Sequence, residues 1–124
     1  HFGTKGSLFE SCQRVKEMQR AHESILLEHF LKYLSNKDDI RILGPTSVNS
    51  RVPTVSLDLG RKSRFVAEEL VTDGIMTDSG DFYAVRLLEA LGVKVKYGVL
   101  RLSFVHYTSE AELEHLIRSL DKYI

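Results

Sequence analysis

Hydrophobic residues recur every three or four positions over residues 8–35, the longest regular pattern in the chain. The positions that carry this pattern are Leu8, Cys12, Val15, Met18, Ile25, Leu26, Phe30 and Tyr33. Because this spacing places side chains on one face of an α-helix, it predicts an amphipathic helix about 40 Å long. Such a helix is longer than a small domain can cover, so we expect part of its apolar stripe to contact another domain or subunit.

Two other segments alternate apolar and polar residues, a period that is typical of half-buried β-strands. They cover residues 54–59 and 97–105, and shorter strands are expected at 40–43 and around 75–77. In the longest segment, one face carries Leu100, Leu102 and Phe104. The opposite face carries Val99, Arg101, Ser103 and Val105. The pattern therefore predicts a sheet with one apolar face and one mixed face.

Helical spacing returns in three segments that follow the predicted strands. One spans residues 63–73, one begins near Asp81 as N-cap and ends at Gly92, and the last opens with the capping box formed by Ser109 and Glu112. Helices that alternate with strands favour an α/β (α+β) sandwich. We expect a small, mostly antiparallel or mixed sheet with helices on one face. Within this single domain, residues 1–36 form the connector helix and residues 37–124 the compact part.

Composition excludes several classes of function. The 124 residues carry a formal net charge of zero, which argues against binding to nucleic acid or to an anionic membrane surface. No apolar run reaches the roughly 20 residues that span a bilayer. The single cysteine, Cys12, allows neither an internal disulfide nor a zinc cluster, is expected to be buried and inert, and favours a cytoplasmic location. The chain begins with His1 rather than methionine, which suggests that it was cut from a longer protein.

Arg101 interrupts an otherwise apolar strand, and this makes it the first candidate for chemistry. A charge taken out of water is costly unless it is paired, so the guanidinium needs either a ligand or a structural partner. A structural partner could be Asp58 on a neighbouring strand. Among the histidines, His22 and His29 are seven residues apart and favour no metal site. His106 follows the arginine strand and could approach the same region.

Three segments in fixed order carry a family resemblance: "RVPTVSLDL", "GIMTDSGDFYAVRLLEALG" and "GVLRLSFVHYTSEAELEHLIRSLD". Together they resemble the C-terminal small domain of class V aminotransferases, which are pyridoxal-phosphate enzymes of fold type I. The similarity is greatest to the branch called cysteine desulfurase-like. It runs from about Arg51 to the end of the chain, and the first helix is similar to the family's connector between large and small domains.

This resemblance implies a role for Arg101, because the family uses an arginine at this position to bind the substrate's α-carboxylate. The turn "TDSGDFYA" would then be a pocket loop that includes Asp78, Ser79, Asp81 and Tyr83, although a simple turn with an N-cap is the alternative. Tyr83 stands where desulfurases carry a nucleophilic cysteine. His106 would make a minor contact at most. No metal is implied.

The resemblance also implies an amino-acid substrate, pyridoxal 5'-phosphate in the parent enzyme, a missing N-terminal large domain and a homodimer. The family's cofactor lysine typically follows a histidine, and this chain has no His-Lys pair. The fragment alone is therefore not expected to bind the cofactor or to be catalytic. The reaction stays open among transamination, desulfuration and a related elimination. The alternative function is a noncatalytic α/β module that binds a protein or a small effector through its open sheet face.

Overall fold

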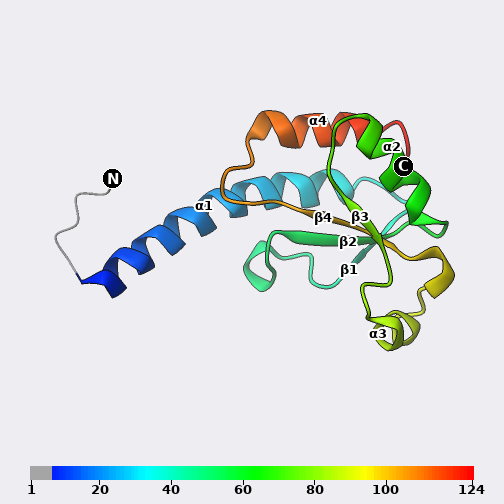
Figure 1. Ribbon diagram of the computed structural model, residues 1–124, viewed down its shortest axis with the longest axis horizontal. Coiled ribbons are helices and arrows are strands. Elements are labelled where there is room, and N and C mark those ends of the chain that lie inside the picture. Colours follow the sequence, from blue (N-terminus) through cyan, green and yellow to red (C-terminus); the bar gives the residue numbers. More distant parts are fainter. Residues whose placement is uncertain (1–6) are drawn as a thin grey trace.

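The computed structural model describes residues 7–124 and shows one four-stranded sheet flanked by helices (Figure 1). The first half of the chain forms α1 (Leu8–Leu34), β1 (Arg41–Leu43), a 3₁₀ turn (Val48–Ser50), β2 (Thr54–Asp58) and α2 (Ser63–Thr72). The second half forms β3 (Asp78–Gly80), α3 (Val85–Ala90), a 3₁₀ turn (Val95–Tyr97), β4 (Val99–Ser103) and α4 (Glu110–Leu120). The α+β class is confirmed. The unusual start at His1 lies outside the described residues.

All strand pairs are antiparallel, and the strand order is β1-β2-β4-β3. The register brings Leu43, Ser56, Arg101 and Asp78 into one row across the sheet. Directly paired residues project from the same face, and successive residues alternate between faces. Arg101 therefore lies on the face opposite to Leu100 and Leu102, as the alternation predicts.

The apolar face of the sheet packs against α1, α2 and α4 in a single core. Leu57 and Leu100 from the sheet, Leu70 from α2 and Leu113 from α4 are all fully buried in this cluster. From α1, Phe30 meets the ring of Phe104 edge-on at a centroid distance of 5.3 Å. Figure 1 shows these three helices on one side of the sheet and α3 on the other.

Only the second half of α1 contributes to this core. Its buried residues begin at Leu26, whereas the first half projects away from the sheet (Figure 1). Leu8, Phe9 and Met18 are consequently exposed. Cys12 is also exposed, so the expectation of a buried cysteine is wrong, because the helix extends beyond the body that would cover it.

Two features predicted between α2 and α3, a strand and a helix N-cap, lie at other residues in the structure. The short strand expected around residues 75–77 lies instead at Asp78–Gly80, where it pairs with β4. Asp81 does not cap α3, whose N-cap is Ala84 without a side-chain hydrogen bond. The carboxylate of Asp81 accepts a hydrogen bond from the backbone N–H of Tyr83 instead, at 2.9 Å. A side chain that satisfies a nearby backbone donor makes a turn, and here it delays the helix.

A second, smaller cluster covers one end of the open sheet face. Leu88 of α3 and Val93 pack on Val99, with Leu43 and Phe82 at the edge. This cluster explains why Val99 is buried although it shares a face with Arg101.

The end of α4 is held by ion pairs to other elements. Asp121 accepts hydrogen bonds from Lys37 at 2.8 Å and from the Tyr33 hydroxyl at 3.0 Å. These contacts, with Lys37 the larger cause, lower the pKa of Asp121 below its usual value. Lys122 donates to Asp73 at 2.9 Å, which ties α4 to the end of α2.

Replacing Phe30 by alanine should destabilise the 124-residue chain by about 3–5 kcal/mol, because it removes a buried ring and leaves a cavity. The measurement is urea-induced unfolding followed by circular dichroism. Ile25→Ala is the matched control on the same helix, since 58% of Ile25 is exposed and its loss should change the free energy of unfolding little. Equal losses in the two variants would contradict the assignment of the core.

Asp121→Asn should lower the stability of the chain at neutral pH, and the difference from wild type should vanish in acid. The pKa of Asp121 is lowered in the folded state, so its stabilising contribution is present above the unfolded value, about 3.9. It is lost as the pH falls through the folded pKa. Urea midpoints measured between pH 7 and pH 2 test this, and a constant offset across that range would refute it.

Candidate functional site

Arg101 occupies the centre of the open sheet face, on the inner strand β4. Its guanidinium carbon lies 3.9 Å from the centroid of the Phe82 ring. Its Nη2 atom lies 3.9 Å from the Asp78 carboxylate, which is too far for a hydrogen bond. Among residues 7–124, no hydrogen-bond acceptor receives a bond from the Arg101 guanidinium, and 42% of the side chain is exposed. The side chain is held in place by stacking while its donors stay available.

Arg41 and Arg51, unlike Arg101, donate hydrogen bonds to protein acceptors. Arg41 donates to the Leu91 carbonyl at 2.8 Å and to Asp58 at 3.0 Å. Arg51 donates to the carbonyls of Pro45 and Thr54. The suggestion that Asp58 is the structural partner of Arg101 is therefore wrong, because Asp58 pairs with Arg41 across the β1–β2 ladder.

A cavity of about 480 Å³ opens beside Arg101 on this face. Arg101 is the one basic residue among those that line it, Asp81 is the one acidic residue, and Ser56 adds a hydroxyl. The rest of the lining is mostly apolar: Leu43, Gly44, Phe82, Ala84, Leu87, Leu88, Leu91 and Val99. A mostly apolar hollow with one cation suits a small molecule that carries an anionic group.

The turn after β3 has an unusual backbone that separates two aromatic side chains. Phe82 and Tyr83 have φ angles of 51° and 60°, in the left-handed region that residues with a Cβ rarely adopt. The Asp81 carboxylate and the Asp81 carbonyl, which accepts from Ala84 N–H at 2.8 Å, hold this turn. Phe82 lines the cavity, whereas Tyr83 is fully exposed.

The structure brings some of the expected pocket residues to Arg101 and leaves others apart. Asp78 lies directly opposite Arg101, and Asp81 lines the cavity. Ser79 pairs with Leu100, which places it on the other face of the sheet. Tyr83 and His106 do not line this cavity. His106 lies with Val15, Met18, Gln19 and His22 around a separate hollow beside α1.

Several residues of the cavity escaped the sequence analysis. Phe82 is the most important of these, and its one sequence signal is that it and Tyr83 are adjacent aromatic residues in an otherwise mostly polar turn. Leu87 and Leu91 are also among these residues; both are exposed, and both line the cavity. Their role depends on where α3 sits over the sheet, which periodicity does not reveal.

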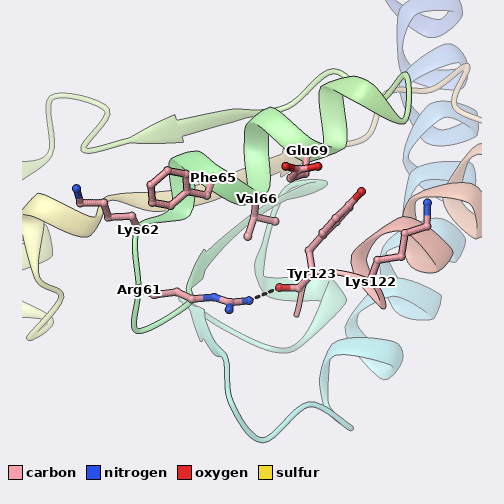
Figure 2. Close-up of a pocket in the computed structure, with 7 residues that line it drawn as sticks. All are labelled: Arg61, Lys62, Phe65, Val66, Glu69, Lys122 and Tyr123. Atoms are coloured by element: carbon pink, nitrogen blue, oxygen red, sulfur yellow. Dashed lines mark hydrogen bonds between the residues drawn. The ribbon is translucent and has the colours of Figure 1, made fainter.

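A second cavity, of about 500 Å³, lies between α2 and the end of the chain (Figure 2). Its lining includes Arg61, Lys122 and Tyr123, and Figure 2 shows the Arg61 guanidinium donating to the Tyr123 carbonyl. Lys122 is paired with Asp73, and this contact is the main cause that raises the pKa of Lys122. Two of the three cations that line this cavity thus already have partners, and the third, Lys62, lies 6.0 Å from the Phe65 ring. The Arg101 cavity is the stronger candidate site because its lining is mostly apolar around a single cation.

Comparison with known proteins decides the family. The sequence model of the family described as Aminotransferase class-V matches residues 7–116, which is most of the chain. The chain belongs to the class-V aminotransferase family.

Two curated relatives give the same picture. The chain is 36% identical over 106 residues to the aminotransferase-like protein FGM3 of Gibberella zeae, which covers 81% of this chain and 26% of that protein. It is 35% identical over 116 residues to a probable cysteine desulfurase of Vibrio cholerae, which covers 94% of this chain and 27% of that protein. The chain thus spans about a quarter of the length of these relatives.

The fold is shared with solved structures. The apo cysteine desulfurase of Thermococcus onnurineus superposes with a TM-score of 0.76 at 24% identity, over 86% of this chain and 26% of that chain. At this identity the likeness shows the fold alone.

Two kinds of feature are absent from residues 7–124. No helix in this range combines the length and the hydropathy that a membrane span requires. In the same part of the chain, no cluster of three or more His, Cys, Asp or Glu side chains could hold a metal ion.

The close approach of Gly98 to Gly80 should be essential for the geometry that sets Asp78 opposite Arg101. A Cβ on Gly98 would lie 2.9 Å from the Gly80 Cα, and Gly98 has a φ of 63°. Gly98→Ala should therefore destabilise the chain by more than the penalty of about 1–2 kcal/mol that a left-handed Cβ alone imposes. Urea unfolding measures the difference.

Gly44→Ala is the matched control for this prediction. Gly44 also has a positive φ, 87°, but a Cβ there would meet nothing within 4 Å. Gly44→Ala should lower the free energy of unfolding only by the penalty for a Cβ at positive φ. A decrease as large as that of Gly98→Ala would contradict the close-approach explanation.

Proposed function

We propose that this chain is the C-terminal part of a pyridoxal-phosphate enzyme that acts on an amino acid, and that Arg101 binds the substrate's α-carboxylate. One observation carries the proposal: a guanidinium with no hydrogen-bond acceptor among residues 7–124 lies beside a largely apolar cavity of about 480 Å³. The family membership supports it, since the aminotransferase family model includes this strand.

The chemistry of a guanidinium suits this role. It is planar, stays charged at any physiological pH, and presents paired N–H donors that match the two oxygens of a carboxylate. The cavity wall is mostly apolar, and its buried members Leu88 and Val99 lower the local polarity, which strengthens an ionic contact. Asp78 approaches only to 3.9 Å and its side chain is 68% exposed, so a ligand carboxylate that replaced it would break only a weak ion pair.

The cofactor itself would be held by another part of the parent protein. Pyridoxal phosphate needs a lysine amine, and no lysine in residues 7–124 lines the Arg101 cavity. The residues around the Arg101 cavity therefore do not fit a cofactor site. The cofactor supplies the electron sink for the reaction at the substrate's α-carbon, and this chain supplies the group that orients the substrate.

The missing part of the parent protein is, on this proposal, an N-terminal large domain. The matched relatives are about four times as long as the region they share with this chain. The exposed first half of α1, with Leu8, Phe9 and Met18, offers an apolar surface toward which such a domain could pack. We further propose that the parent is a cytoplasmic homodimer, as the family resemblance implies.

The turn that carries Tyr83 bears on the type of reaction. Transfer of sulfur through a persulfide requires a thiolate, and Tyr83 offers a phenol. Cys12, the single thiol, lies in the exposed first half of α1 and does not line the cavity. We propose that this turn shapes the pocket and takes no sulfur, which favours transamination or elimination over desulfuration through this loop.

The test uses the full-length parent protein, purified with added pyridoxal phosphate. A visible absorption band that borohydride reduction removes should report cofactor bound through a lysine. Arg101→Ala should keep this band and raise the KM for the amino-acid substrate by about 10- to 100-fold, the size expected for losing a charge-assisted contact of 1.5–3 kcal/mol.

Arg64→Ala is the control, because Arg64 forms an exposed i,i+4 pair with Glu68 on α2 and should leave KM unchanged. A parent protein without a reducible band would instead support the noncatalytic binding module. An unchanged KM in the Arg101 variant would refute the proposal that Arg101 binds the substrate's α-carboxylate.

A further inference from the structure

Phe82 makes a contact with Arg101 that the fold alone does not require. The ring centroid lies 3.9 Å from the guanidinium carbon, which is van der Waals contact. Of the other cation and ring contacts in residues 7–124, none is shorter than 5.3 Å. The Phe82–Arg101 stack is therefore much tighter than the loose surface contacts elsewhere in the molecule.

The backbone of the turn is arranged to hold the ring there. Phe82 adopts a φ of 51°, which is unfavourable for a phenylalanine, and Tyr83 follows with 60°. Two hydrogen bonds to Asp81, from Tyr83 N–H and Ala84 N–H, stabilise this conformation. Unfavourable backbone conformations persist only where the surroundings over-determine them, and they are common at functional sites.

We propose that Phe82 is a positioning residue that fixes the guanidinium plane of Arg101 for edge-on, bidentate contact with a substrate carboxylate. A ring stacked on one face of a guanidinium blocks that face and limits rotation about the side chain's last bonds. It leaves the N–H edges free, and these edges are what a carboxylate binds. The inference rests on the function proposed above, and it concerns how Arg101 is held rather than whether Arg101 binds.

The competing explanation is that Phe82 merely completes the small apolar cluster. Phe82 does pack at the edge of the cluster formed by Leu88, Val93 and Val99. That role alone predicts a loss of stability on substitution, with no specific effect on carboxylate binding. The two explanations therefore differ in whether the effect of Phe82 depends on Arg101.

The experiment is a double-mutant cycle between Phe82→Leu and Arg101→Ala in the full-length parent loaded with pyridoxal phosphate. L-cysteine and L-alanine serve as probes, with cysteamine and ethylamine as counterparts that lack the carboxylate. Apparent Kd is read from the change in the cofactor's absorption spectrum on titration. This readout needs no knowledge of the reaction or its product.

Phe82→Leu should weaken binding of the amino acids by about 2- to 5-fold, the size of a cation–π contact at a partly exposed site, and leave the amines unaffected. In the Arg101→Ala background, Phe82→Leu should have no further effect. Phe82→Tyr retains the ring and should bind as wild type does. Phe65→Leu makes the same change at an exposed phenylalanine, 6.0 Å from Lys62, and should have no effect.

The outcomes separate this inference from the proposal beneath it. If Arg101→Ala weakens amino-acid binding but Phe82→Leu does not, or if the two effects simply add, Phe82 has no positioning role and the carboxylate assignment stands. If Arg101→Ala leaves binding unchanged, or neither amino acid alters the spectrum, both proposals are overturned. Urea midpoints measured on the same variants detect loss of folding, and Phe82→Met, which also removes the ring but keeps a large apolar side chain, replaces the leucine variant if that variant unfolds.

Discussion

The burial of Leu100 and Leu102 against the helices is the constraint on which the rest of the structure depends. Both residues lie on β4, an inner strand of the sheet, and are buried in the main core. Because side chains alternate along a strand, the burial of these leucines places Arg101 on the open face of the sheet. A shift of one residue in this register would turn the arginine into the core and the leucines into water. The core thus orients the candidate site.

The sequence predicts those parts of this arrangement that depend on local patterns. It misses the parts that depend on backbone angles or on contacts between residues far apart in the sequence. The alternation along β4 predicts the open-face position of Arg101, because that pattern is local and its period is two. The turn at Asp81 was misjudged, since whether that carboxylate caps a helix or a tight turn depends on backbone angles that the sequence does not display. The position of β3 depends on the contact of Gly80 with Gly98, which are far apart in sequence.

The first helix presents a different difficulty, which is that periodicity does not say what covers an apolar stripe. The stripe from Leu8 to Tyr33 is continuous in the sequence, yet only its second half meets the core of this chain. The exposed state of Cys12 follows from the same fact. An apolar surface of this kind is expected to meet a partner, since large uncovered patches favour association. Within residues 7–124, this half of α1 stays exposed.

Arg41 and Arg101 lie on the same sheet but differ in whether their guanidinium groups donate hydrogen bonds to protein acceptors. Arg41 meets Asp58 and the Leu91 carbonyl at hydrogen-bond distance, so its donors are used and its removal would leave Asp58 without its partner. Arg101 has a carboxylate at 3.9 Å and a ring against its face. An exposed ion pair of that length contributes about 0–1 kcal/mol, and a stacked ring uses none of the guanidinium's donors. A ligand carboxylate could therefore bind Arg101 without breaking a strong contact. The unused donors of Arg101, rather than its charge, distinguish it as the candidate binding residue.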